Sequence, residues 1–383
     1  MLAGLFLSNF GTQMLSLAVS WDLYIQTRSA LILGNVGFAQ VAPFLLFSLF
    51  AGHVADRYDR HRTMVLAQVL ALAASLPLLM GLRSVPVIYS CLFFLALGRA
   101  FQWPARQALL QHIVSADALN NAITWNSSAQ EISSISGPAL AGILLATSGS
   151  RVVYLVQIVC ACLALACFFA VRYRSKPVEN APAPTGKSLL EGMNFVWSNK
   201  LILSAISLDL FAVLFGGATA LLPIYAADIL HAGARGLGWL RTAPSVGSVA
   251  MALVLAHSPR IRAAGKTLLW AVAGFGAATI VFGLSRYLWL SLAMLVLVGA
   301  FDNVSVVLRQ SLLQTKTPDY VRGRVLAFSS IFISSSNQFG AVESGWTAAW
   351  FGAVTSVAGG GVATIAVVLI CAAVSVPLRK WRQ

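Results

Sequence analysis

Long apolar runs follow one another along almost the whole 383-residue chain, and they constrain its fold more than any other feature. A helix crosses a bilayer core about 30 Å thick with roughly 20 apolar residues. Only 10% of the residues are charged, against about 25% in soluble proteins, so a soluble globular fold is excluded. Runs such as VIYSCLFFLALG do not alternate apolar and polar residues, which excludes a β-barrel. The sequence predicts an all-α membrane protein.

Twelve apolar runs are separated by charged or turn-forming segments, and we expect each run to form one transmembrane helix. They lie at residues 2–26, 31–55, 64–82, 86–110, 120–147, 152–172, 201–229, 236–256, 267–284, 287–311, 325–350 and 353–377. The first run lacks the basic leader of a signal peptide, so we expect it to be retained. We predict two pseudo-symmetric six-helix bundles, at 1–172 and 201–383. The proline-containing, mixed-charge segment 173–200 predicts a cytoplasmic linker, whose apolar spacing at 189–197 favours either a surface helix or an extension of the seventh span.

The basic residues indicate the orientation of the chain. The net charge of +14 would indicate nucleic-acid binding in a hydrophilic chain, but the mean hydropathy of +0.80 argues against that partner. With a cytoplasmic N-terminus, nineteen of the 26 Lys and Arg, including Arg106 and Arg309, fall in cytoplasmic segments and five in outer loops. Loops rich in Lys and Arg stay cytoplasmic, so both termini are predicted inside the cell.

A short internal repeat supports two equivalent halves. The segment RQALLQHIVSADAL begins at Arg106 and RQSLLQTKTPDYV begins at Arg309, so both contain Arg-Gln-x-Leu-Leu-Gln followed by an aspartate. Both copies close an even-numbered span, which is typical of parallel repeats related by an axis along the membrane normal. We therefore expect a small-molecule substrate to bind between the halves, near the bilayer midplane.

A charged turn ends the second span with the sequence GHVADRYDRHRT. It resembles the signature loop of the major facilitator superfamily, with Asp59 where that family usually has glycine and His61 where it has a basic residue. The resemblance implies a cytoplasmic latch, in which an aspartate lies opposite a helix N-terminus. A positive-inside anchor is the alternative, and the corresponding loop of the second half lacks the acid. The predicted latch residues are Gly52, Asp56, Arg57, Arg60 and Arg62.

The fourth and fifth spans carry further similarities to the superfamily. Arg99 and Gln102 resemble its Arg-x-x-Gln motif, with Trp103 in place of the next glycine. A charge at the bilayer centre costs at least ~2.5 kcal/mol, so Arg99 is expected to face an interior pathway. Gly137, Pro138 and Gly142 resemble the Gly-Pro element of its antiporters, which implies a bending helix; a kinked packing helix is the alternative. Polar residues along the fifth and eleventh spans predict that both helices are buried.

Five carboxylates lie within the predicted spans. We predict that Glu131 couples proton movement to transport with Arg99 as its modulating charge, and that Asp302 and then Asp209 are the alternatives. Asp22 and Glu343 lie toward the outer face, where we expect them to be hydrated. Polar residues predicted to line the substrate cavity are Asn9, Gln13, Gln102, Gln130 and Asn337.

Together with VRGRVLAF and ESGWTAAWFGAV, these motifs resemble the superfamily branch of enterobactin, macrolide and other drug exporters. The resemblance implies proton-coupled export of an amphipathic molecule, and multidrug resistance, in the inner membrane of a bacterium. Inward symport or facilitated transport is the alternative, and a prenyl-transferring enzyme using Asp56 and Asp59 is a remote one. No cofactor or metal site is expected, because TGKS and AGKT lack the first glycine of a phosphate loop and the five cysteines lie in apolar runs. We expect a monomer that is not an enzyme.

Overall fold

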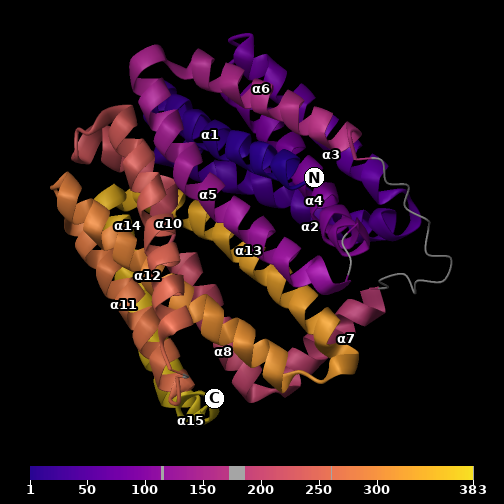
Figure 1. Cartoon of the computed structure of the whole chain (residues 1–383). Helices are drawn as coiled ribbons and strands as arrows, with labels where there is room; N and C mark the ends of the chain where they lie inside the picture. The colour runs from indigo at the N-terminus through magenta and orange to yellow at the C-terminus, as the bar shows by residue number, and fades with distance from the viewer. Residues whose placement is uncertain (114–115, 172–185, 260, 383) are drawn as a thin grey trace. The chain divides into compact units, whose positions relative to one another are not determined.

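The computed structural model describes residues 1–113, 116–171, 186–259 and 261–382, and every regular element in these ranges is a helix (Figure 1). Only the backbone is described at residues 48–49, 52–53, 55–57, 107–108, 110–113, 116–117, 119–120 and 186–190. In chain order, the elements are α1 (Leu2–Thr27), α2 (Ala30–Arg57), α3 (Arg60–Leu79), α4 (Val85–Ile113), α5 (Ala116–Ser148), α6 (Ser150–Phe169), α7 (Gly186–Ser198), α8 (Lys200–Phe215), η1 (Ala218–Leu221), α9 (Leu222–Ile224), η2 (Tyr225–Ile229), α10 (Gly233–His257), α11 (Ala264–Leu284), α12 (Leu288–Lys316), α13 (Asp319–Phe351), α14 (Ala353–Val374) and α15 (Val376–Lys380).

Within the described ranges, eleven helical segments are long and apolar enough to cross a membrane. One of them, Lys200–Ile229, runs through α8, η1, α9 and η2. The fifth predicted span forms α5, which has 33 residues but is not among the eleven. Its polar side chains lower its hydropathy, as the sequence of the span already indicated. The prediction of an all-α membrane protein with twelve spanning helices in two bundles is confirmed.

The seventh predicted span is not one continuous α-helix. α8 ends at Phe215, and the chain continues through Gly216 and Gly217 into the 3₁₀ turn η1. A Cβ atom on Gly217 would lie 2.6 Å from the Ser344 hydroxyl oxygen of α13. The close approach of α13 therefore requires glycine here. Apolarity alone did not predict this interruption.

The chain divides into two compact units, each containing most of one predicted bundle. Unit 1 comprises Met1–Arg28, Phe38–Pro184 and Gly233–Thr242, and unit 2 comprises Ser29–Gly37, Thr185–Ala232 and Ala243–Gln383. The predicted boundaries differ from these. Residues 29–37, which include the start of α2, group with unit 2, and residues 233–242, at the start of α10, group with unit 1. Residues 173–185 of the predicted linker lie outside the described residues.

In unit 1, α1 packs against α5 and α6, and α3 packs against α4 and α6. Small residues allow the close approach that membrane helices need when lipid supplies no hydrophobic driving force between them. A Cβ atom on Gly137 of α5 would lie 2.9 Å from the Gln13 Cβ of α1. Met14 and Phe168 are completely buried in the same unit. These contacts place polar residues of α1, α4 and α5 inside the unit.

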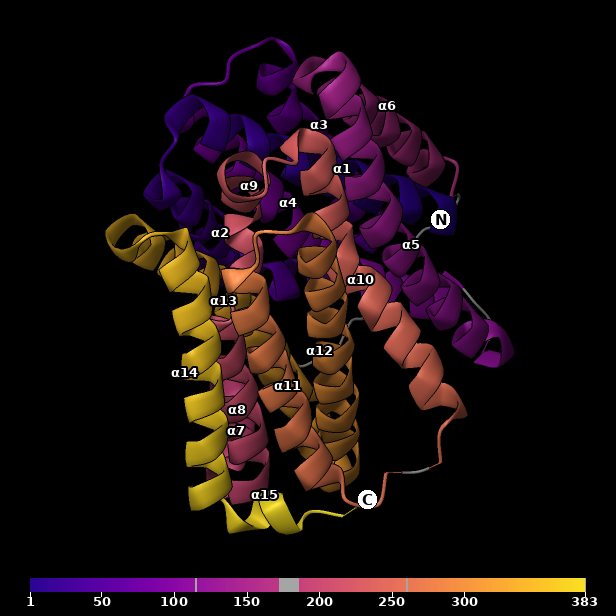
Figure 2. The same cartoon turned by 90° about the vertical axis from the view of Figure 1, so that its left-hand side faces the viewer.

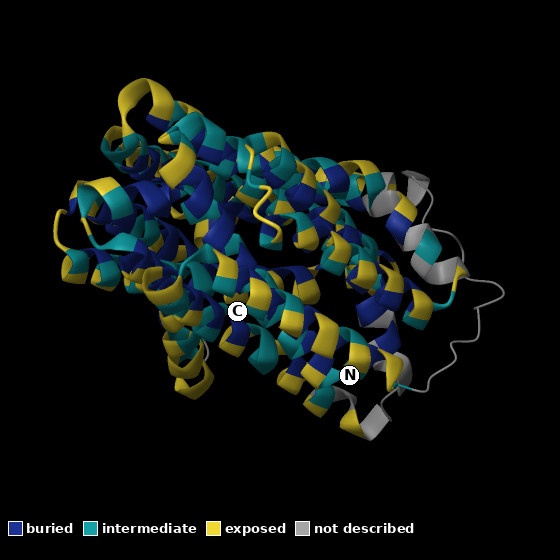
Figure 3. Ribbon diagram, turned by 90° about the horizontal axis from the view of Figure 1, so that it is seen from above, coloured by how far each residue is buried: buried dark blue, intermediate teal, exposed yellow. Residues whose placement is uncertain are grey.

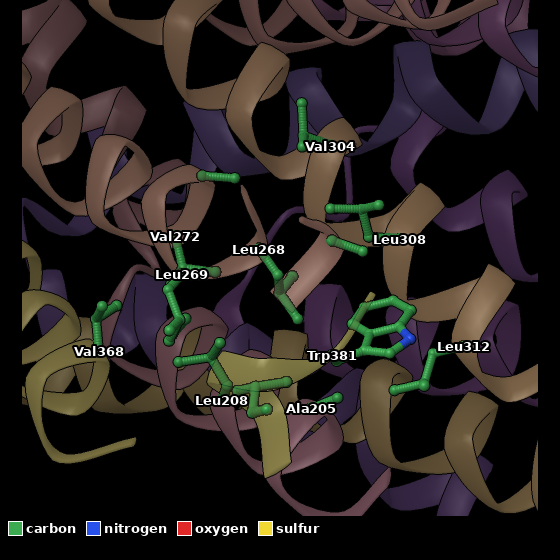
Figure 4. Close-up of a cluster of buried hydrophobic side chains, with 14 residues drawn as sticks. Ala205, Leu208, Leu268, Leu269, Val272, Val304, Leu308, Leu312, Val368 and Trp381 are labelled. Atoms are coloured by element: carbon green, nitrogen blue, oxygen red, sulfur yellow. The ribbon is translucent and has the colours of Figure 1, made fainter. Parts of the chain in front are cut away.

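In unit 2, α11 lies between α12 and α14, and α8 packs on α14 (Figure 2). One apolar cluster joins these helices to the last turn of the chain. Leu208 of α8, Leu268 of α11 and Leu308 of α12 gather around Trp381, which is 5% exposed (Figure 4). This cluster lies beside the buried charges of the unit, which are described below.

α7 is a separate helix that packs along α13 inside unit 2, so the described part of the predicted surface helix 189–197 is helical. Glu191 pairs with Arg324 of α13, Val196 is buried and Trp197 is 66% exposed. Asn199 ends any continuity with α8, because its side chain caps that helix. Exposed positions recur along the long helices (Figure 3). Many of them carry large apolar side chains, as expected for surfaces that face lipid.

Candidate functional site

The structure does not bring Arg99 and Glu131 together in an ion pair. The Arg99 side chain is exposed on α4, and its Nη2 donates to Oε1 of Gln40 on α2 at 3.3 Å. Glu131 is exposed on α5 and forms no ion pair with any described residue. Both helices were predicted, but the rotation of each side chain about its helix was not available from spacing. The pairing of these two residues is therefore not supported by a contact.

Gln102 instead joins a buried hydrogen-bond network centred on Gln68 of α3. The Oε1 atom of Gln68 accepts from the Ser8 hydroxyl at 2.8 Å and from Gln102 Nε2 at 3.2 Å. Its Nε2 donates to the Ala161 carbonyl of α6 at 3.4 Å. Gln68 is 2% exposed. The sequence did not single out Gln68, although an amide inside an apolar span is a usable signal.

Polar residues on α1 and α5 face one another. Gln13 Nε2 donates to the Ser134 hydroxyl at 3.1 Å, and the buried Ser133 hydroxyl donates to the Phe6 carbonyl at 3.3 Å. The amide nitrogen of Asn9 is buried without a hydrogen-bond partner among the described residues, and Gln130 is partly exposed. These two helices therefore carry three of the five predicted cavity residues.

Asn337, another predicted cavity residue, is exposed on α13 in unit 2. Its Nδ2 donates to the Ile333 carbonyl one turn earlier in the same helix, at 2.9 Å. Asn337 and the polar residues of α1 and α5 therefore belong to different units.

The predicted bending element lies inside an unbroken α5, which contains Pro138. Gly137 packs on α1, as described above. Gly142 packs on the segment of α10 that belongs to unit 1, where a Cβ atom would lie 2.7 Å from the Gly238 Cα. The two glycines are therefore close-packing positions in this structure, and bending stays a prediction.

The two arginines that begin the internal repeat are both buried, but their partners differ. Arg106 is 7% exposed and donates through Nη2 to the Asn126 side-chain oxygen of α5. Arg309 is 3% exposed and forms an ion pair with Asp209 of α8. The positive-inside pattern assigns both arginines to cytoplasmic segments. Their burial shows that they act as interior charges, a role that the repeat itself could have signalled.

Asp302 and Asp209 line the same small cavity in unit 2. Asp209 is 5% exposed, and Asp302 interacts electrostatically with both Asp209 and Arg309. Of the four predicted coupling residues, these two are the ones that the structure brings together. Arg309, which links them, was not among the predicted site residues.

Asp22 belongs to a buried cluster near the end of α1, so the expectation that it is hydrated is wrong. It is 7% exposed and accepts from the Tyr154 hydroxyl at 2.9 Å and from the Ser150 hydroxyl. Arg83 lies 3.4 Å from its carboxylate and 5.2 Å from the Tyr154 ring centroid. These partners lie far from Asp22 in the sequence, so local sequence patterns do not reveal them. Glu343 is partly buried on α13 and accepts from the Ser344 hydroxyl at 3.4 Å.

The predicted latch is described only in part. Only the backbone is described at Gly52, Asp56 and Arg57. Beyond them, the Asp59 carboxylate accepts from the backbone N–H groups of His61 and Arg62 at 2.9 and 3.2 Å and so caps α3. Arg60 is buried and Arg62 is exposed. Asp59 is thus a helix cap, which accounts for an acid at this position.

Several known proteins resemble this chain along most of its length. The sequence profile of a family described as transmembrane secretion effector matches residues 2–383. The staphyloferrin A transporter of Staphylococcus aureus is 24% identical over 332 residues, covering 84% of this chain and 82% of its own. The enterobactin exporter EntS of Shigella boydii is 26% identical over 391 residues, covering 99% and 91%.

Solved transporter structures share the fold. A POT family transporter in complex with 5-aminolevulinic acid superposes with a TM-score of 0.77 at 10% identity, covering 99% of this chain and 96% of its own. A bacterial homologue of the human lysosomal transporter Spinster superposes with a TM-score of 0.77 at 14% identity, covering 99% and 97%. At these identities the likeness concerns the fold alone.

Proposed function

Because this chain belongs to the transmembrane secretion effectors of the major facilitator superfamily, we propose that it exports a siderophore-type or drug-type amphipathic molecule by proton-coupled alternating access. The observation that carries the proposal is the nearly full-length similarity to a siderophore exporter and to a siderophore transporter. The multi-span fold and these bacterial relatives place the protein in a bacterial inner membrane. Cytoplasmic termini and a monomeric state are part of the proposal.

The polar residues of α1 and α5 are the proposed substrate contacts in unit 1. Asn9 has a buried amide nitrogen with no partner among the described residues, and Gln13 is held by Ser134, so these helices offer both a free donor and an oriented one. An unpartnered buried donor costs free energy, which a polar substrate atom would recover. Gln130 of α5 completes the proposed set in unit 1.

Proton entry can supply the energy for export. One proton crossing ~100 mV supplies ~2.3 kcal/mol. At 1.36 kcal/mol per tenfold change, this sustains roughly a 50-fold gradient of a neutral substrate. One titrating carboxylate is therefore sufficient. Glu131 stays a candidate. The alternative carboxylates Asp209 and Asp302 are supported by the cavity that they line together and by the ion pair between Asp209 and Arg309.

Transport in everted membrane vesicles tests the proposal. Enterobactin, staphyloferrin A, a macrolide and a tetracycline would be offered outside, with the lumen acidified or at equal pH. We expect at least one compound to accumulate only with an acid lumen, and nigericin to abolish the accumulation. Vesicles without the protein are the control. Accumulation that ignores the pH gradient, or accumulation only with an alkaline lumen, would contradict proton-coupled export and favour facilitated transport or symport.

The proposed cytoplasmic latch has its own variant. Asp56→Asn is expected to lose most transport and still insert in the membrane, because the change removes only the negative charge of the proposed latch. Asp59→Asn is the matched control, since asparagine also caps helices well and should leave transport near the native rate. A native transport rate in Asp56→Asn would contradict the latch and favour the alternative, in which this charged turn is only a positive-inside anchor.

A further inference from the structure

Arg309 and Asp209 form a charge pair inside unit 2 that joins α12 to α8. Their side chains are 3% and 7% exposed. A guanidinium and a carboxylate in such a setting must neutralise one another, because each alone would be strongly destabilised by the loss of water. The pair is therefore a fixed structural element with no net charge.

A second carboxylate lies beside this neutral pair. Asp302, Ser305 and Arg309 are three and seven residues apart on α12, so they share one face of the helix. Asp302 and Ser305 line a cavity of about 10 Å³ together with Asp209. Its remaining lining is apolar and includes Phe275 of α11 and Phe301 of α12. Asp302 is therefore an additional negative charge in a site whose cation is already engaged.

Ser305 gives an independent sign that this cavity takes a small polar occupant. It is 3% exposed, and its hydroxyl has no hydrogen-bond partner among the described residues. Buried hydroxyls are normally bonded, so an unpartnered one that lines a cavity points to a ligand or a water. The cavity is close to the roughly 10–15 Å³ that one water requires.

The other helices that pack on this site supply no second counter-charge within the described residues. α14 contains no charged residue and carries Cys371 near its end, and α11 carries only Lys266, in its first turn. In the part of α10 that belongs to unit 2, His257 is the last residue and its Nδ1 contacts the Leu253 carbonyl at 2.9 Å. The charged residues of α13 are Asp319, Arg322, Arg324 and Glu343: the first two pair with one another, Arg324 pairs with Glu191, and Glu343 interacts with Ser344.

The repeat in unit 1 provides an internal comparison. Arg106 occupies the position that corresponds to Arg309, but its partner is the neutral amide of Asn126. The α4 residue that corresponds to Asp302 is Arg99, which lies seven residues before Arg106. The arginine is thus common to both copies, whereas the two carboxylates occur only in unit 2.

We propose that Asp302 binds the transported proton and that the Asp209–Arg309 pair is a positioning element for it, an inference that rests on the proposed proton-coupled export. Proton binding forms an O–H bond on the Asp302 carboxylate at the expense of a hydronium ion, and release returns the proton to water. The protonated carboxyl can donate to Ser305 directly or through one water. Neutral Asp302 leaves the site without net charge, and ionised Asp302 leaves it with one negative charge.

A pH-jump measurement on proteoliposomes tests this without a substrate. Purified protein would be reconstituted on a solid-supported membrane, and the charge displaced by a step in external pH would be recorded. We expect wild type to give a transient, Asp302→Asn to lose at least 80% of it, and Glu343→Gln, a matched change of another partly buried carboxylate, to keep it. Asp209→Asn should keep the transient with its midpoint at lower pH, because Arg309 then interacts with Asp302 alone.

The outcomes separate this inference from the proposed function. If Asp302→Asn retains the transient and Glu131→Gln loses it, the inference is overturned in favour of Glu131. If the transient depends on sodium concentration at fixed pH, the bound ion is sodium and the assignment of a proton is wrong. If no siderophore or drug is transported but the transient disappears in Asp302→Asn, the proton site stands and the proposed substrate class fails. Circular dichroism and the elution volume of each variant distinguish loss of the transient from loss of the fold, and Arg309→Lys, which keeps the charge, should preserve the transient.

Discussion

Gln68 illustrates how one amide can connect several helices in a membrane protein. Its two polar atoms bond to α1, α4 and α6 while its own residue lies on α3. Hydrogen bonds between membrane helices contribute about 0.6 kcal/mol on average and up to about 1.7 kcal/mol. The three bonds therefore contribute about 2 kcal/mol to unit 1.

We expect Gln68→Leu to lower the thermal midpoint of unfolding in detergent, with a free-energy loss of about 1–3 kcal/mol, because Ser8 and Gln102 lose their shared acceptor. Gln26→Leu, at an exposed position near the end of α1, is the matched control and should leave the midpoint unchanged. Equal midpoints for Gln68→Leu and wild type would show that this network does not stabilise the unit.

At the scale of single residues, the sequence identified charged positions more reliably than their partners. Asp209, Asp302 and Arg99 stood out because charges inside apolar runs are costly and therefore rare. Their partners depend on helix rotation and on contacts between distant spans, which a local pattern does not contain. Arg99 consequently contacts Gln40 rather than Glu131, and Asp22 is buried against Arg83 and Tyr154.

At the scale of elements, the positions of the helices were largely predictable because a span is set by the local length of an apolar run. The break in the seventh span was not, since Gly216 and Gly217 interrupt the helix where α13 approaches. Close approaches of this kind depend on glycines whose neighbours are remote in sequence. Two adjacent glycines of α14 show the difference clearly.

Gly360→Ala is expected to destabilise unit 2, whereas Gly359→Ala is not. A Cβ atom on Gly360 would overlap the Phe215 carbonyl oxygen of α8, whereas a Cβ atom on Gly359 meets no atom within 4 Å. In a helix interior alanine is about 0.8–1.0 kcal/mol more favourable than glycine, so Gly359→Ala should be neutral or stabilising. Thermal unfolding of both variants in one detergent provides the comparison. A lower midpoint for Gly359→Ala than for Gly360→Ala would contradict the packing described here.

At the scale of the whole molecule, the distribution of charge predicts the orientation in the membrane. Five basic residues fall in predicted outer loops and most of the others in predicted cytoplasmic segments, although Arg106 and Arg309 are interior charges. Removing these two from the cytoplasmic set still leaves seventeen against five. The positive-inside rule therefore gives the same orientation.

Cysteine labelling in intact cells tests this orientation. In a variant without the five native cysteines, Arg286→Cys, between α11 and α12, should react with a membrane-impermeant maleimide. Arg262→Cys, between α10 and α11, should react only after the cells are permeabilised. The opposite pattern would invert the predicted topology.

The unequal partners of Arg106 and Arg309 have a consequence for how such a duplicated chain can diverge. An arginine buried with a carboxylate cannot be lost alone, because the carboxylate would remain as an uncompensated charge. Residues 209 and 309 should therefore change together among related sequences. Positions 106 and 126 should vary more independently, because the Asn126 amide tolerates the loss of its donor Arg106 better than the Asp209 carboxylate tolerates the loss of Arg309. If the two segments derive from one ancestral segment, selection on Arg309 is expected to act on Arg309 and Asp209 together.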